Sequence, residues 1–171
     1  MEGIVPLSEH RARIQQEVAK QLAAVMDGEM VLPVQKLQSF RKKEEHRLKL
    51  WHRSGGGGRE IASRRAEMVD ILFREIFRFS TIRETGEKEI PGLMVGAFGG
   101  YGRRELNPCS DVDITFFHEG PRPTKQMEQI ISSCLMALWD LGFKVGHATR
   151  SIKGALEQAN SDMMTKTAMI E

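Results

Sequence analysis

The sequence predicts an α/β fold in which helices come first and a small sheet follows. Before residue 81, apolar side chains recur at helical spacing in three segments. After it, two short runs rich in apolar and β-branched residues, Leu93–Phe98 and Asp111–Phe117, are typical of strands. A chain of 171 residues, 40% of them hydrophobic, is also long enough to bury one real core.

Three helices are expected before the sheet. The first is capped by Ser8 and stopped by Gly28, the second opens at Pro33, and the third spans 59–80. Their apolar residues are Ile14, Val18, Leu22, Val25 and Met26 in the first, Val34, Leu37, Phe40, Leu48 and Trp51 in the second, and Ile61, Met68, Leu72, Ile76 and Phe79 in the third. The glycines at 55–58 lack the Gly-Lys-Ser/Thr of a Walker A loop, so we interpret them as a flexible joint.

The second half of the chain alternates helices and strands. After the first strand we expect a short helix (101–106), the strand 111–117, an amphipathic helix (125–141), a third strand (143–152) and a final helix (159–171). These elements divide the chain into a helical N-terminal region, 1–88, and a core region, 89–171.

The most informative stretch joins a glycine turn to two aspartates. Gly99-Gly100 ends the first strand, and the amides that follow are expected to form a helix N-terminus suited to phosphate. Residues two apart on a strand share a face, so the carboxylates of Asp111 and Asp113 can reach one site while Val112 points away. Oxygen ligands without His or thiolate suit Mg²⁺. A plain solvent-exposed strand is the alternative, but the ordered combination favours metal-dependent phosphate chemistry.

This stretch resembles the motif of the polymerase-β-like nucleotidyltransferase superfamily, through Gly99-Gly100, ten residues, and then Asp111-Val112-Asp113-Ile114. The longer segments GGYGRRELNPCSD and LWDLGFKVGHATRSI are similar to bacterial PII uridylyltransferase/uridylyl-removing enzymes, in their N-terminal part. The resemblance implies a nucleotidyltransferase core with a mixed sheet over 89–171, cut short at its C-terminal end. It also implies Mg²⁺-dependent transfer of UMP from UTP to a tyrosine hydroxyl of the PII signal protein.

Several residues beside the motif are candidates for binding the nucleotide. Asp111 and Asp113 would hold the metal, and Gly99 and Gly100 would let the backbone approach the phosphates. Tyr101, Arg103 and Arg104 lie in the phosphate-facing segment, where a planar guanidinium suits a triphosphate or departing pyrophosphate. Ser110 could bind phosphate or close the turn after Pro108, and we favour the turn.

The third acidic group of the superfamily has no obvious counterpart. The third strand offers Val145-Gly146-His147 where a carboxylate is usual, and the narrower family also has this sequence. Strand alternation puts His147 on the Phe143 face, where it is either an auxiliary proton acceptor or a structural histidine. Asp140 and Asp162 are the other acids to test, with Asp162 favoured as a helix N-cap.

Composition narrows the setting of this chemistry. A net charge of +2 does not favour a nucleic-acid partner, and two cysteines without metal or redox spacing indicate a reducing cytoplasm. We expect no membrane segment or signal peptide. The alternatives are a nucleotidyltransferase using another nucleotide or acceptor, and a non-catalytic nucleotide-binding regulatory module. We expect this stretch of chain alone to have little activity and to self-associate through an uncovered apolar surface.

Overall fold

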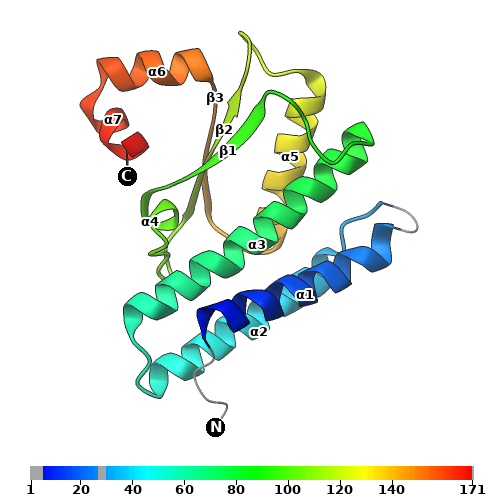
Figure 1. Cartoon of the computed structure of the whole chain (residues 1–171), viewed down its shortest axis with the longest axis vertical. Helices are drawn as coiled ribbons and strands as arrows, with labels where there is room; N and C mark the ends of the chain where they lie inside the picture. The colour runs from blue at the N-terminus through cyan, green and yellow to red at the C-terminus, as the bar shows by residue number, and fades with distance from the viewer. Residues whose placement is uncertain (1–5, 27–29, 171) are drawn as a thin grey trace.

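The computed structural model describes residues 6–26 and 30–170 (Figure 1). The helices are α1 (Leu7–Met26), α2 (Val34–Arg53), α3 (Gly58–Thr85), α4 (Gly99–Gly102), α5 (Lys125–Asp140), α6 (Ile152–Ser161) and α7 (Met163–Ile170). The strands are β1 (Leu93–Phe98), β2 (Val112–His118) and β3 (Val145–Ser151). This order confirms the predicted α/β fold with helices ahead of the sheet.

The three strands form one mixed sheet in the order β1-β2-β3. β1 pairs with β2 antiparallel and β2 pairs with β3 parallel, which confirms the predicted mixed sheet. In β2, Val112, Ile114 and Phe116 are buried, whereas Asp113 between them is exposed. The alternation gives the sheet one core-facing side and one open side, as the period of two requires.

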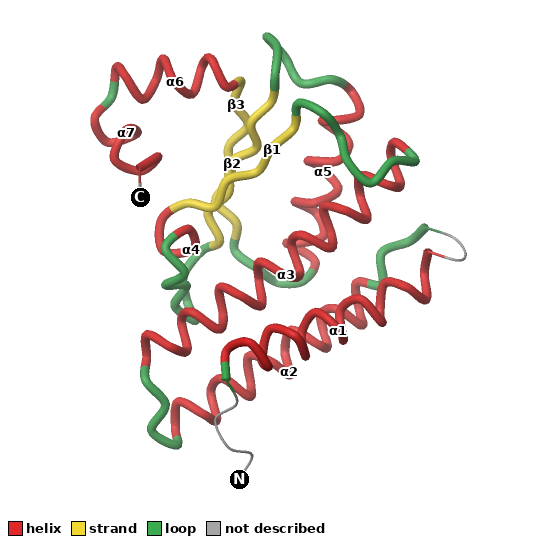
Figure 2. The backbone as a smooth tube through the Cα atoms, viewed as in Figure 1, coloured by secondary structure: helices red, strands yellow, loops and turns green. Residues whose placement is uncertain are grey.

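Helices α3 and α5 cover the core-facing side of the sheet. Figure 2 shows both helices on one side of the strands and α6 and α7 on the other. The ring of Phe73 on α3 lies 6.3 Å from that of Phe116 on β2, centroid to centroid, so the two elements are in direct contact. A single buried cluster runs from α1 through α3 to the sheet and α5.

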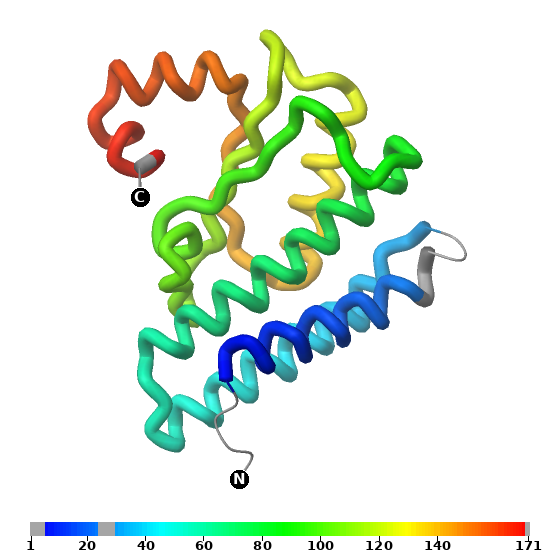
Figure 3. Tube along the Cα trace, viewed as in Figure 1, coloured from blue at the N-terminus to red at the C-terminus, as the bar shows by residue number. Residues whose placement is uncertain are grey.

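The first two helices run side by side along α3 (Figure 3). Ile14, Val18 and Leu22 are buried on the predicted face of α1, and Leu37 and Phe40 on that of α2. Between the helices, buried Glu44 receives hydrogen bonds from Arg13 at 2.7 and 2.5 Å and from Arg47 at 2.6 Å. Such multiple charge-assisted bonds satisfy the carboxylate that the core encloses. The side chains of Val25 and Met26 and the predicted stop at Gly28 lie outside the described part.

Several predicted boundaries were wrong. α1 begins at Leu7, so Ser8 lies in its first turn and does not cap it. α4 is one turn, Gly99–Gly102, in place of 101–106, because Arg104 takes a left-handed φ of 59° that ends the helix. β3 is shorter than 143–152, and α3 runs to Thr85, past residue 80.

The end of the described chain holds two helices where one was predicted over 159–171. Gly154 N donates a hydrogen bond to Ser151 Oγ at 3.0 Å, so Ser151 caps α6 and the helix begins at Ile152. Extended backbone at Asp162 then interrupts the run. The Asp162 carboxylate accepts from Met164 N at 3.3 Å and Thr165 N at 2.9 Å, which confirms its prediction as a helix N-cap.

Candidate active site

The two aspartates lie at the start of β2 on the open side of the sheet. Asp111 and Asp113 are exposed and flank buried Val112, so the core anchors the strand while both carboxylates stay outside it. Neither carboxylate has an ion pair or hydrogen bond within the described residues. A cation bound by both carboxylates would supply the opposite charge that they lack.

Glycines enclose the Asp113 carboxylate on two sides. Gly99 follows β1 with a left-handed φ of 56°, and a Cβ there would lie 3.4 Å from Asp113 Oδ2. On the other neighbouring strand, Gly146 is the register partner of Asp113, and a Cβ on it would overlap Asp113 Oδ1. The structure therefore brings together the predicted glycine turn and the predicted aspartate, and Gly146 lies beside the other oxygen of the same carboxylate.

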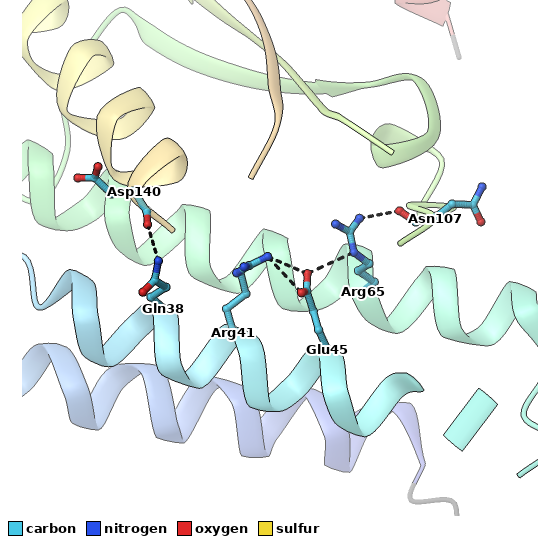
Figure 4. Close-up of polar contacts among 6 residues, drawn as sticks. All are labelled: Gln38, Arg41, Glu45, Arg65, Asn107 and Asp140. Atoms are coloured by element: carbon cyan, nitrogen blue, oxygen red, sulfur yellow. Dashed lines mark hydrogen bonds and ion pairs between the residues drawn. The ribbon is translucent and has the colours of Figure 1, made fainter. Parts of the chain in front are cut away.

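Two arginine contacts fasten the loop between α4 and β2 to the helical layer. Arg104 Nη2 lies 3.2 Å from Oε2 of Glu67, a buried residue of α3. Arg65, also buried on α3, donates to the Asn107 carbonyl at 2.7 Å and lies 3.7 Å from Glu45 on α2 (Figure 4). Because buried charges are retained only when paired, these contacts fix the loop that delivers Asp111.

Two further contacts involve residues of α2 (Figure 4). Arg41 donates to both oxygens of Glu45 at 3.1 Å, and Gln38 donates to the Asp140 carbonyl at 3.1 Å. The site loop is thus tied to α3 by Arg65 and Glu67, and the end of α5 is tied to α2 by Gln38.

The remaining predicted phosphate ligands point in different directions. Tyr101 is buried among core residues, and burial, together with the charge of Asp70, raises the pKa of its hydroxyl. Arg103 is exposed, and its Nε lies 3.6 Å from Glu105 Oε2, while Arg59 Nη2 lies 3.3 Å from Glu105 Oε1. Gly100 packs against its own loop, since a Cβ there would lie 3.2 Å from the Glu105 carbonyl oxygen.

Ser110 and His147 make contacts that do not involve the carboxylates. Ser110 N donates to the Asn107 carbonyl at 3.0 Å, which fits the favoured turn. His147 pairs in register with Ile114, a core-facing residue, and its ring meets the Trp139 ring of α5 edge-on at 5.9 Å. Residues paired in register share a face, so His147 lies on the side of the sheet opposite Asp113.

Sequence reasoning missed three residues that shape this site. Glu67 and Arg65 are charged residues on the buried side of α3, and their position within an apolar helical stripe was a readable signal. Gly146 interrupts a strand, where glycine often marks a close approach. Within the described residues, no third His, Cys, Asp or Glu joins Asp111 and Asp113 in a metal-binding group.

Comparisons with known proteins bear on this geometry. No family model matches the chain. A protein of Rhodospirillum rubrum is 39% identical over 123 residues, 68% of this chain, and one of Novosphingobium aromaticivorans is 42% identical over 122 residues, 67% of the chain. One from Bradyrhizobium diazoefficiens is 33% identical over 157 residues, 88% of the chain. All three are named bifunctional uridylyltransferase/uridylyl-removing enzyme.

This chain belongs to the bifunctional uridylyltransferase/uridylyl-removing enzyme family. It spans 13 to 15% of the length of these relatives. Membership supports nucleotidyltransferase chemistry at the level of the family, and it agrees with the resemblance of the segment that contains the two aspartates. None of the helices in the described residues combines the length and apolar character needed to cross a membrane.

Proposed function

We propose that this chain carries the nucleotidyl-transfer site of a uridylyltransferase, which moves UMP from UTP to a tyrosine hydroxyl of the PII signal protein in the cytoplasm. The observation that carries the proposal is the pair of exposed carboxylates, Asp111 and Asp113, beside the left-handed turn at Gly99. The family name of the relatives supports the reaction class.

The donor set fits Mg²⁺. Both groups are hard oxygen donors, and no His or Cys accompanies them within the described residues. Mg²⁺ keeps several waters and binds through one or two carboxylates plus substrate phosphates, so two aspartates meet its needs. When bound, Mg²⁺ supplies positive charge that stabilises the attacking and leaving oxygens of in-line displacement.

Each neighbouring residue has a defined part in the proposed reaction. Asp111 and Asp113 would hold the metal and, with it, the triphosphate. The turn at Gly99 would let the backbone approach the phosphates. Arg103 is exposed on the same segment and would direct its guanidinium toward the pyrophosphate, whereas Arg104 is directed to Glu67. A bond forms between the tyrosine oxygen and the α-phosphorus, the hydroxyl proton passes to water, the bond from the α-phosphorus to the bridging oxygen of the β-phosphate breaks, and pyrophosphate leaves.

The direct test is transfer of label from UTP to PII in the presence of Mg²⁺, measured in a full-length enzyme that contains this chain, because this stretch alone is expected to have little activity. Asp111→Asn or Asp113→Asn should lower the rate at least a hundredfold, on the order of the several kcal/mol that metal-held charge contributes. Circular dichroism should not change, because both side chains are exposed. Glu128→Gln, an exposed carboxylate on α5, is the matched control.

The outcomes separate the possible activities. Transfer rates of the aspartate variants within a few-fold of the unaltered chain would overturn the metal site. Transfer from ATP but not UTP, or to an acceptor other than PII, would keep the site and replace the substrate. Nucleotide binding without any transfer, and unchanged on adding EDTA, would favour a non-catalytic regulatory module.

A further inference from the structure

We propose that Gly146 is a positioning residue that sets the direction of the Asp113 carboxylate. The inference rests on the proposed function, because it assigns a role within the same metal site. It concerns a residue of β3, which lies beside β2 in the sheet and contributes no charged group at this register position.

The conformation of Gly146 does not require glycine. Its φ lies outside the left-handed region that alanine avoids. Glycine inside a strand also weakens the strand, since it loses more conformational freedom on folding than alanine does. A glycine here therefore lowers stability without any backbone reason, and space is the remaining explanation.

The space beside Gly146 is occupied by the carboxylate. A Cβ on Gly146 would overlap Asp113 Oδ1 and would lie 3.5 Å from Asp113 Cγ. On the opposite side, the Cβ position of Gly99 is 3.4 Å from Oδ2, an ordinary contact distance. The carboxylate thus fills the room that the absent side chain of Gly146 leaves.

The obstacle that alanine creates falls on the free end of a side chain. Asp113 Oδ1 belongs to an exposed group with no other partner in the described residues, so the carboxylate can rotate while the sheet stays in place. Gly146→Ala should therefore leave the fold intact and turn Asp113 away from the metal. A glycine with a purely structural role would not combine an intact fold with weaker metal binding when it is replaced by alanine.

The test measures metal affinity and stability on the same variants of the full chain. Mn²⁺, a hard divalent cation that prefers oxygen ligands, is titrated and its free concentration followed by electron paramagnetic resonance, with and without UTP. Gly146→Ala should weaken Mn²⁺ binding about tenfold or more, the range typical of losing a group that orients a metal ligand. Its melting temperature should equal or exceed that of the unaltered chain.

Two controls separate position from size. Ala148→Gly changes the same face of β3 two residues along and should leave Mn²⁺ affinity unchanged. Gly58→Ala adds a methyl group where nothing lies within 4 Å and should do the same.

The outcomes distinguish this inference from the proposed function. If the unaltered chain binds Mn²⁺ and the Asp113→Asn and Gly146→Ala variants do not, both the metal site and the positioning role of Gly146 stand. If Gly146→Ala binds Mn²⁺ as well as the unaltered chain does while Asp113→Asn fails to bind, the positioning role is overturned and the metal site stands. If the unaltered chain and the Asp113→Asn variant bind Mn²⁺ equally well, or if neither binds it, both the metal site and the positioning role are overturned.

Discussion

Acid should destabilise this fold through His10, which lies in the interface of the first helices. His10 is only 5% exposed, and burial together with the charges of Arg64 and Arg13 lowers its pKa from 6.5 to about 4, with Glu44 opposing and Arg47 adding to the effect. The folded chain therefore keeps His10 neutral in a range of pH where the unfolded chain protonates it.

The direction and size of the change in the free energy of unfolding follow from this difference in proton affinity. The unfolded chain binds more protons between pH 6.5 and about 4, so stability rises with pH across that window. Below about pH 4, His10 is protonated in both the folded and the unfolded chain, and its contribution to stability is lost completely. One tenfold step in affinity is about 1.4 kcal/mol, so the free energy of unfolding should fall by about 2 kcal/mol from pH 7 to pH 5 through His10 alone.

Urea unfolding, followed by circular dichroism at pH 7, 6 and 5, measures this slope. His10→Gln should remove most of the loss between pH 7 and pH 5, because glutamine does not titrate. His46→Gln, which replaces an exposed histidine on α2, should retain it. A His10→Gln variant whose stability still falls by about 2 kcal/mol would refute the assignment.

Two further predictions concern the loop and the far face of the sheet. Glu67→Gln leaves Arg104 and Arg11 without their charged partner and should lower stability by about 1 to 2 kcal/mol, a modest cost because both arginines are about half exposed; equal urea midpoints would contradict this anchor. His147→Ala should keep the rate of nucleotidyl transfer within a few-fold and leave its pH profile unchanged, since His147 lies opposite Asp113. A large loss of transfer with normal folding would instead restore its auxiliary role.

Local patterns predicted the elements that depend on neighbouring residues alone. The strand Leu93–Phe98 was confirmed at both ends, because an apolar run bounded by a turn and by Gly99 is a complete local signal. The faces of β2 were also predictable, since Val112 alternates with the two aspartates. The prediction that Asp162 caps a helix succeeded for the same reason.

Features that depend on distant residues were not predictable. Arg104 was a candidate for binding phosphate, but it turns toward Glu67, a residue of a different element. Tyr101 was expected on the phosphate side, but a one-turn α4 orients it into the core. For His147, alternation correctly placed the ring on the Phe143 side of the strand, yet only the pairing of β3 with β2 reveals that this is the side opposite Asp113.

The missing third acid can now be sought by geometry. On β3 the residues that share a face with Asp113 are Gly146 and, at the period of two, Ala148 and Arg150, and none of them is acidic. At Gly146, the position of β3 that pairs with Asp113, there is no side chain, and the carboxylate of Asp113 itself occupies that space. In the proposed Mg²⁺ site, a third oxygen ligand would therefore come from the nucleotide phosphates, from water or from another element, which is consistent with the few protein ligands that Mg²⁺ requires.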